Sequence, residues 1–132
     1  MIVVDNSVLV PAVLDADPTY LVRRAAARDA IWILPPLWQF EFTNSMTTLA
    51  KRRVVSPDVA RAALVEARVL VHNRVVAVDQ LDAFRFALSL DISGYDAQYI
   101  ALADAYGVRC VTNDRQLAAR AGHHAMLLSE AV

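Results

Sequence analysis

Four acidic residues stand where the surrounding sequence pattern calls for buried or neutral side chains. Asp5, Glu41, Asp96 and Asp114 each lie at or near the edge of an apolar segment. Carboxylates drawn together from distant parts of a fold repel one another, so a shared location is favourable only with a hard cation to neutralise them. The four acids therefore predict a divalent-metal site. A cation held in this way can activate a water molecule and neutralise charge on a phosphodiester during hydrolysis.

Three of these acids also fit a purely structural role. Aspartate is a favoured helix cap, and Asp5, Asp96 and Asp114 each stand beside the start of an expected helix. Ser93 and Asp96 have the spacing of a hydroxyl cap followed by an acid. Taken singly, each is better explained as a cap than as a catalytic group. Glu41 differs because it lies several residues into a long expected helix, where no free helix end needs an acceptor.

The helix that carries Glu41 places short polar side chains on the same face. At helical spacing Glu41 lines up with Asn44, Ser45 and Thr48, and the stripe continues to Arg52. A solvated helix face would give the same stripe. Short neutral side chains are unusual on an exposed helix, however, and they favour a wall that lines a polar cleft.

The elements that must position the acids alternate between short apolar runs and longer helical patterns. Such runs, separated by helices, are typical of a parallel sheet covered on both faces. The expected strands are residues 2–4, 31–34, 75–78, 108–111 and 125–128. The expected helices are residues 7–14, 18–28, 37–53, 57–71, 81–89, 95–106 and 114–122.

This order of elements brings acids to one edge of the expected sheet. Asp5 directly follows the first strand, and Asp114 lies just past residues 108–111. Asp96 opens the helix that leads into that later strand. Ligands of open parallel sheets bind beyond the carboxyl ends of the strands. Three of the four acids are therefore expected to converge by topology alone.

The composition is that of one globular domain, residues 1–132. With 57% apolar and 20% charged residues, a mainly disordered chain is excluded. The single cysteine, Cys110, lies in an apolar run and is expected to be a buried thiol. No secretory signal opens the chain, and no apolar run approaches the roughly 20 residues of a membrane span. We expect a soluble cytoplasmic protein without a membrane partner.

Four segments of the chain together resemble a known family. They are Val3-Val4-Asp5-Asn6-Ser7-Val8-Leu9, Glu41-Phe42-Thr43-Asn44, Tyr95-Asp96-Ala97-Gln98-Tyr99-Ile100-Ala101-Leu102-Ala103 and Val111-Thr112-Asn113-Asp114-Arg115-Gln116-Leu117. In this order and at this spacing they resemble the PIN-domain ribonucleases. They look most like the VapC toxins of bacterial type II toxin-antitoxin systems, and the match covers nearly the whole chain.

The resemblance implies a fold and a metal-dependent activity. The fold is a three-layer α/β/α sandwich with a central, mainly parallel sheet of four to five strands. The activity is cleavage of single-stranded or looped RNA with Mg²⁺ or Mn²⁺. Asp5 and Asp96 match the principal metal-binding aspartates, Glu41 matches the helical glutamate, and Asp114 matches the fourth acid. Asp5 and Asp96 are expected to contact the ion directly, whereas Glu41 and Asp114 reach it directly or through water.

Polar neighbours of these acids match supporting positions of the family. They are Ser7, Asn44 and Thr112. Gln116 and Leu117 stand in a region where many relatives carry one further acid. Their neutrality weakens the expected hold on a second metal ion.

Basic residues near the acids are candidates for contacts with RNA phosphates. They are Lys51, Arg52 and Arg53 at the end of the helix that carries Glu41, and Arg115 directly after Asp114. Cations also favour the carboxyl end of a helix without any RNA, so residues 51–53 have a structural explanation as well.

The resemblance further implies two protein partners. One is a cognate antitoxin whose segment lies across the acidic groove, and the other is a second copy of the chain in a homodimer. We expect the apolar surface of residues 11–14 and the helix that begins near Trp38 to receive the antitoxin segment.

Three other functions compete with this interpretation. A phosphoacceptor receiver domain has paired acids after its first strand and a later lysine, but here Asn6 follows Asp5 and the last third contains no lysine. A metal-dependent phosphatase has a second aspartate two residues after its nucleophile, a position that Ser7 occupies. A degenerate PIN scaffold that only binds would not need all four acids.

The three histidines fall outside the motifs and are expected at the surface. They are His72, His123 and His124.

Overall fold

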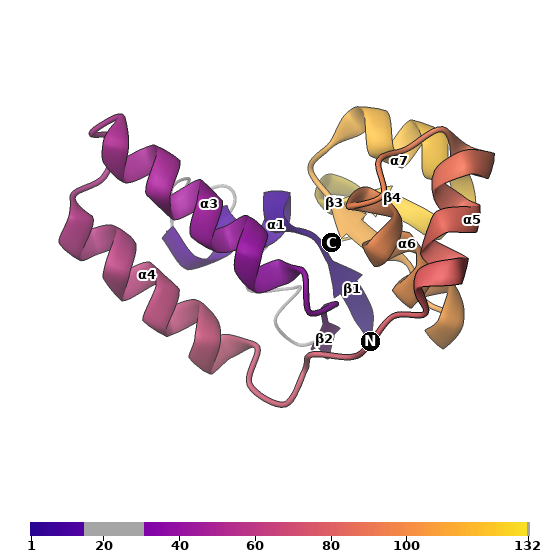
Figure 1. Ribbon diagram of the computed structural model, residues 1–132, viewed down its shortest axis with the longest axis horizontal. Coiled ribbons are helices and arrows are strands. Elements are labelled where there is room, and N and C mark those ends of the chain that lie inside the picture. Colours follow the sequence, from indigo (N-terminus) through magenta and orange to yellow (C-terminus); the bar gives the residue numbers. More distant parts are fainter. Residues whose placement is uncertain (15–30, 132) are drawn as a thin grey trace.

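A parallel sheet lies at the centre of the computed structural model, which describes residues 1–14 and 31–131. Its strands are β1 (Ile2–Val4), β2 (Trp32–Ile33), β3 (Cys110–Thr112) and β4 (Ala125–Leu127). They are arranged in the order β2-β1-β3-β4, and all neighbours are parallel (Figure 1). β1 is central, so the residue that follows it points toward the middle of the carboxyl edge.

Helices cover both faces of this sheet. The described helices are α1 (Asn6–Leu14), α3 (Trp38–Lys51), α4 (Pro57–Leu70), α5 (Gln80–Leu90), α6 (Asp96–Tyr106) and α7 (Arg115–Ala121). α1, α3 and α4 lie on one side and α5, α6 and α7 on the other (Figure 1). Two short 3-10 turns, Gly122–His124 and Leu128–Glu130, flank β4. The predicted three-layer α/β/α fold is therefore confirmed.

Two apolar clusters account for the layered packing. Side chains alternate across a strand, so Val3 packs toward α6 whereas Val4 packs toward α1 and α3. Ile33 and Leu34 divide between the same two clusters. Because both faces are covered, the strands read as nearly continuous apolar runs, as the sequence indicates. Cys110 is fully buried in the second cluster, as expected for a structural thiol.

Local signals in the sequence mark several helix ends. The hydroxyl of Ser56 accepts a hydrogen bond from the backbone N–H of Val59 at 3.1 Å, and Pro57 is the first residue of α4. α6 ends at Gly107, whose φ of +63° is easily reached only without a side chain. The start of α4 and the end of α6 were both expected from the sequence.

The predicted strand at residues 75–78 is wrong. Only Val75 forms a bridge, with Leu34, and the backbone around it makes two hydrogen bonds to Leu34. This segment lies beside the β2 edge of the sheet, and Asp79 already caps α5. The chain therefore has too few residues in register to form a strand.

The bounds of other elements differ from those expected from the sequence by a few residues. The expected strand 108–111 begins at Cys110, and the helix expected over 37–53 begins at Trp38 and ends at Lys51. The helix expected over 18–28 lies outside the described residues. Within the described residues, no helix combines the length and apolar character needed to cross a membrane.

Candidate active site

Asp5 lies at the centre of the carboxyl edge of the sheet. β1 pairs with β3 so that Val4 lies beside Val111, which places Asp5 next to Thr112. Only 6% of Asp5 is exposed. Its Oδ1 accepts a hydrogen bond from the Ser7 hydroxyl at 2.6 Å, and its Oδ2 accepts one from the Thr112 hydroxyl at 2.5 Å. The carboxylate is therefore held from two sides by residues 105 positions apart in the sequence.

Backbone donors fix the direction of these two hydroxyls. The N–H of Asn113 donates to Ser7 Oγ at 2.8 Å, and the N–H of Asp114 donates to Thr112 Oγ1 at 3.0 Å. Each hydroxyl oxygen thus accepts from the backbone and is free to direct its own proton to Asp5. This network ties the loop after β3 to the start of α1.

Glu41 is positioned from the opposite layer of the fold. It lies in the first turn of α3, nearer the helix start than the sequence indicated, where a negative charge is also favoured by the helix dipole. Its side chain does not cap the helix. Instead Oε1 accepts a hydrogen bond of 2.5 Å from the hydroxyl of Tyr99 on α6, a residue that is 1% exposed.

Tyr99 is the residue of the site that the sequence analysis missed. It lies one helical turn after Asp96, and that spacing was the available signal. A tyrosine in the apolar run of α6 reads as core, so the pattern gave no indication of a polar role. Burial raises the pKa of Tyr99 above its ordinary range, with the charge of Glu41 contributing, so the hydroxyl stays a donor.

Asp114 has the capping role expected of it, whereas at the start of α6 the hydroxyl of Ser93, and not the side chain of Asp96, accepts the backbone N–H. The N–H of Asp96 donates to Ser93 Oγ at 2.9 Å. Asp114 Oδ1 caps α7 by accepting from the N–H groups of Gln116 and Leu117 at 2.9 and 3.0 Å. The negative charge of Asp96 acts on both Asp5 and Glu41, and that of Asp114 acts on Asp96. Asp96 is therefore the electrostatic centre of the four.

Burial and mutual repulsion raise the pKa of three of these acids, Asp5, Glu41 and Asp96. Burial raises the pKa of Asp5 from 3.8 to about 6, against the hydrogen bonds of Ser7, Thr112 and the Val8 backbone, and the Asp96 charge raises it further. Burial likewise raises the pKa of Glu41 and of Asp96. The Tyr99 hydrogen bond lowers the pKa of Glu41, and the Asp114 charge raises that of Asp96.

Neutral groups, not cations, surround the four acids. Within residues 1–14 and 31–131, the ion pairs join Arg85 to Asp82, Arg120 to Asp91 and His124 to Asp104. None of the four acids takes part in these pairs. The hydroxyls of Ser7, Thr112 and Tyr99 orient carboxylate oxygens but leave their charge uncompensated. A structural ion-pair network therefore does not explain the cluster.

The donor set fits a hard divalent cation held mainly by two carboxylates. No three His, Cys, Asp or Glu side chains of the described residues are grouped tightly enough to form a ready-made cage. Mg²⁺ does not require one, because it commonly takes one or two protein carboxylates and retains several waters. Buried, mutually repelling aspartates at Asp5 and Asp96 suit that mode of binding.

A groove runs from this cluster between α1 and α3. Its volume is about 380 Å³, and its lining includes Ser7, Asn44, Ser45 and Thr48. The polar stripe of α3 is thus the wall of a groove, as the sequence analysis favoured. Asn6 Nδ2 donates to Ser45 Oγ at 2.8 Å and links the two helices across it.

The basic residues that are candidates for contact with RNA are exposed to solvent. Lys51, Arg52 and Arg53 are exposed at the carboxyl end of α3, and Arg115 is exposed at the start of α7. Of the histidines, His72 and His123 are exposed as expected, whereas His124 is half-buried against Phe86.

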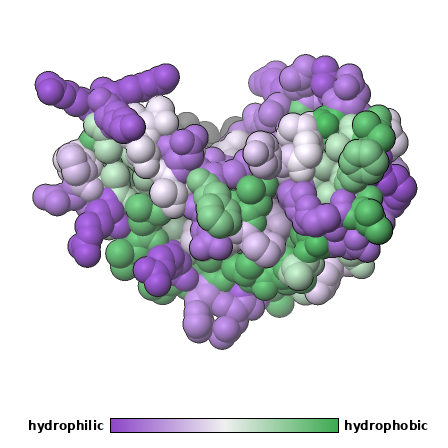
Figure 2. Space-filling model, in the orientation of Figure 1, coloured by the Kyte–Doolittle hydropathy of each residue, from purple (hydrophilic) through white to green (hydrophobic). Residues whose placement is uncertain are grey.

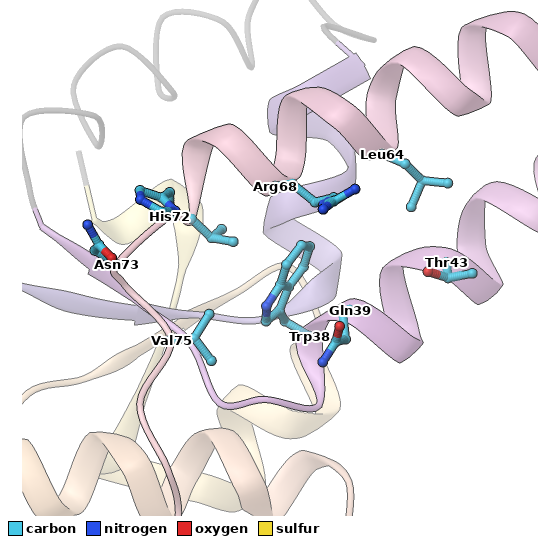
Figure 3. A pocket seen from close by; sticks show the side chains of 9 residues that line it. Trp38, Gln39, Thr43, Leu64, Arg68, His72, Asn73 and Val75 are labelled. Atoms are coloured by element: carbon cyan, nitrogen blue, oxygen red, sulfur yellow. The ribbon is translucent and has the colours of Figure 1, made fainter.

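A larger cavity lies away from the acids. It measures about 500 Å³ and opens between α3, α4 and the segment that follows α4 (Figure 3). Gln39 and Thr43 line it from α3, on the opposite side of that helix from Glu41 and Thr48. Trp38 forms part of the wall together with Arg68. None of the four acids lines this cavity.

Comparison with known proteins gives consistent similarities. The sequence profile of the PIN domain matches residues 2–123. The chain is 31% identical over 120 residues to ribonuclease VapC1 of Mycobacterium tuberculosis, covering 91% of this chain and 90% of that protein. It is 30% identical over 122 residues to ribonuclease VapC3 of Pyrobaculum aerophilum, covering 89% and 92%.

A solved structure shares the fold. The crystal structure of PAE2754 from Pyrobaculum aerophilum superposes with a TM-score of 0.77 at 22% sequence identity. The match covers 98% of this chain and 84% of that one. The arrangement of the layers is therefore found in an experimentally determined protein.

Proposed function

Because the chain belongs to the PIN-domain family and is similar over most of its length to VapC-type ribonucleases, we propose that it is a metal-dependent endoribonuclease. One observation carries the proposal. Four acids from β1, α3, α6 and the loop after β3 act on one another electrostatically, and no cation of the described residues pairs with them. The expected catalytic residues are Asp5, Glu41, Asp96 and Asp114.

Each acid has a role that follows from its surroundings. Asp5 and Asp96 bind a divalent cation directly, with Ser7 and Thr112 holding both oxygens of Asp5 in place. When bound, Mg²⁺ or Mn²⁺ supplies a water of lowered pKa and neutralises charge on the phosphodiester. Glu41 and Asp114 orient water around the ion, because no three of these acids form a direct cage in the described residues.

Glu41 is suited to receive a proton. Tyr99 occupies Oε1, so Oε2 is the oxygen left to accept hydrogen from an attacking water. Burial raises the pKa of Glu41, which makes it a stronger base than an exposed glutamate. The exposed side chains of Arg115 and of residues 51–53 are the proposed contacts to phosphates of the RNA.

Cleavage of an RNA panel tests this function. The wild type with Mg²⁺ or Mn²⁺ is expected to cut at least one single-stranded or looped RNA, and chelation of the metal is expected to stop it. Asp5→Asn and Asp96→Asn should each abolish cleavage. Asp58→Asn, which changes an exposed acid on α4, is the matched control and should cleave normally. Cleavage that survives both site substitutions, or that needs no metal, would falsify the mechanism.

A cognate antitoxin is the second part of the proposal. Ala12, Val13 and Trp38 are buried, so the surface expected from the sequence is wrong in these positions. The groove between α1 and α3 remains, lined by Val10, Pro11 and Leu49 on its apolar part and leading to Ser7. An inhibitory segment lying there would cover the approach to Asp5.

Co-expression with the neighbouring gene tests this partner. The neighbour's product should co-purify with the chain and inhibit RNA cleavage. Pro11→Glu should weaken both binding and inhibition without unfolding the protein, because Pro11 is only half-buried. A neighbour that neither binds nor inhibits would remove the toxin role and leave the nuclease intact.

A homodimer in the cytoplasm completes the proposal. Three side chains of α5, Leu81, Phe84 and Leu88, are 79%, 63% and 69% exposed, and their spacing puts them on one face of the helix. A contiguous apolar face of this kind marks an interaction surface. The molecular mass in solution should be that of two chains, and Phe84→Glu should lower it toward one.

A further inference from the structure

Two exposed aromatic residues immediately precede two of the acids. Phe40 is followed by Glu41 and Tyr95 by Asp96, and both aromatic side chains are 67% exposed. By contrast Trp32, Trp38 and Phe86 are buried. Burying a side chain such as Phe stabilises the folded state by roughly 1.5–3 kcal/mol. Phe40 and Tyr95 do not provide this stabilisation, because both rings are largely exposed.

The two residues belong to elements that meet at the site. Glu41 in the first turn of α3 accepts the hydrogen bond of Tyr99 on α6, and the Asp96 charge raises the pKa of Glu41. The beginnings of α3 and α6 therefore face each other. Figure 1 shows α3 and α6 on the two sides of β1, and Figure 2 shows apolar surface near the middle of this view and an indentation at its upper margin between the two halves of the molecule.

Helical geometry puts Phe40 on the rim of the site and not in its floor. Successive residues of a helix point about 100° apart, so Phe40 and Glu41 point in different directions, and the 67% exposure of Phe40 shows that its ring faces solvent. Tyr95 precedes the first residue of α6 in the same way. Among the described residues, the close ring pairs involve Trp38, Phe42, Phe86 and the two adjacent histidines, so neither rim ring stacks on a protein ring.

We propose that Phe40 and Tyr95 are stacking platforms for the nucleobases on the two sides of the phosphodiester that is hydrolysed at the acids. This rests on the proposed ribonuclease function. An exposed ring offers a flat apolar face to any unpaired base, and such stacking tolerates all four base types. The phosphates between the bases then lie over the acids, while a base-paired strand cannot use the rings because its bases already stack on one another.

RNA binding by rim variants tests the platforms. All substitutions of Phe40 and Tyr95 are made in the Asp5→Asn protein and measured in Mg²⁺, so that the RNA is bound but not cleaved. Phe40→Ala and Tyr95→Ala should each weaken binding of a short fluorescent single-stranded RNA about 5- to 100-fold. Phe40→Trp and Tyr95→Phe should restore it. Tyr106→Ala at the far end of α6, about 16 Å from Tyr95, should bind as the background does.

An RNA with abasic sites separates stacking from other causes of loss. If the rings stack on bases, Phe40→Ala and Tyr95→Ala should bind the abasic strand no more weakly than their background does. A 2-aminopurine placed beside the cleaved bond should lose fluorescence on binding only when the rings are present. Circular dichroism melting checks the fold, which these exposed positions should leave unchanged.

The outcomes separate this inference from the nuclease itself. If the wild type cleaves RNA but both alanine variants keep full affinity, or lose it equally on abasic RNA, the platforms are overturned and the nuclease stands. If the variants change only the molecular mass in solution, the rings belong to an interface between two copies, and the inference is again wrong. If the wild type neither binds nor cleaves RNA, both proposals fall.

Discussion

Replacing Asp5 with asparagine should stabilise the metal-free protein. Burial and the Asp96 charge raise the pKa of this carboxyl from 3.8 to about 6, so its ionised form opposes folding at neutral pH. At about 1.36 kcal/mol per pKa unit, the opposition amounts to roughly 3 kcal/mol at neutral pH. Asparagine keeps the shape and removes the charge. The free energy of unfolding should therefore rise by about 1–3 kcal/mol, once the new amide contacts are allowed for.

The hydroxyls around Asp5 can adapt to the amide. An asparagine would direct its NH₂ group at one hydroxyl oxygen, which must then send its own proton elsewhere. Ser7 Oγ and Thr112 Oγ1 are 3.2 Å apart, so that proton can pass between them. Both hydroxyls are then satisfied, whereas the second N–H of the amide gains no acceptor from them, a cost that keeps the expected gain below the full electrostatic penalty.

The sign of the pH dependence follows from the raised pKa. The folded state holds the Asp5 proton more tightly than the unfolded state, so the penalty is complete above about pH 6 and fades as the pH falls toward 3.8. The stability advantage of the variant should therefore shrink by about 2 kcal/mol between neutral pH and pH 4.5, because the Asp5 penalty falls from roughly 3 to about 1 kcal/mol. Asp96 interacts with Asp5, so the difference between the two proteins reports Asp5 together with its coupling to Asp96.

Urea unfolding followed by circular dichroism measures this difference. Wild type and Asp5→Asn are compared in EDTA at several values between about pH 7.5 and 4.5. Added Mg²⁺ should then stabilise the wild type much more than the variant, because only the folded state binds the ion. A variant that is less stable than the wild type at neutral pH, or whose advantage does not change with pH, would refute the reasoning.

Two other substitutions separate orientation and capping from charge. Tyr99→Phe removes the hydrogen-bond donor to Glu41 and should lower the free energy of unfolding by about 1.5–3 kcal/mol. It should also reduce kcat and leave KM unchanged. Tyr106→Phe is the exposed control, and equal losses in both variants would contradict a specific role of Tyr99. Asp114→Asn keeps the α7 cap and should leave stability within about 0.5 kcal/mol while lowering cleavage, whereas Asp114→Ala should also lose about 1 kcal/mol of stability. Normal cleavage by Asp114→Asn would leave capping as the only role of that residue.

The sequence predicted those features that depend on local pattern. Apolar runs located β1 and β3, the Ser56–Pro57 pair marked the start of α4, and Gly107 marked the end of α6. These signals work because a buried strand, a helix cap and a left-handed residue each impose a local chemical requirement. The strand expected at residues 75–78 failed because pairing depends on a neighbour, and only Val75 bridges to Leu34.

The contacts that shape the site are long-range and left little trace in the sequence. Thr112 reaches Asp5 only through the register of β3 against β1. Tyr99 and Glu41 meet only because α3 and α6 approach each other above the strand edge. Glu41 was singled out as lying deep in its helix, yet α3 begins later than expected and places it in the first turn. Its significance comes from Tyr99 and not from its distance to the helix end.

The choice of partners around the acids favours the proposed metal site over a structural carboxylate cluster. A structural carboxylate cluster would gain most from arginine or lysine, which compensate charge directly. In the described part of the chain these acids meet hydroxyls and backbone N–H groups instead. Such donors set the orientation of an oxygen without neutralising it, so the uncompensated charge persists until a cation or a proton arrives. The raised pKa of Asp5 is the consequence that a titration can measure, and it links the cost of gathering these carboxylates to the metal binding that we propose.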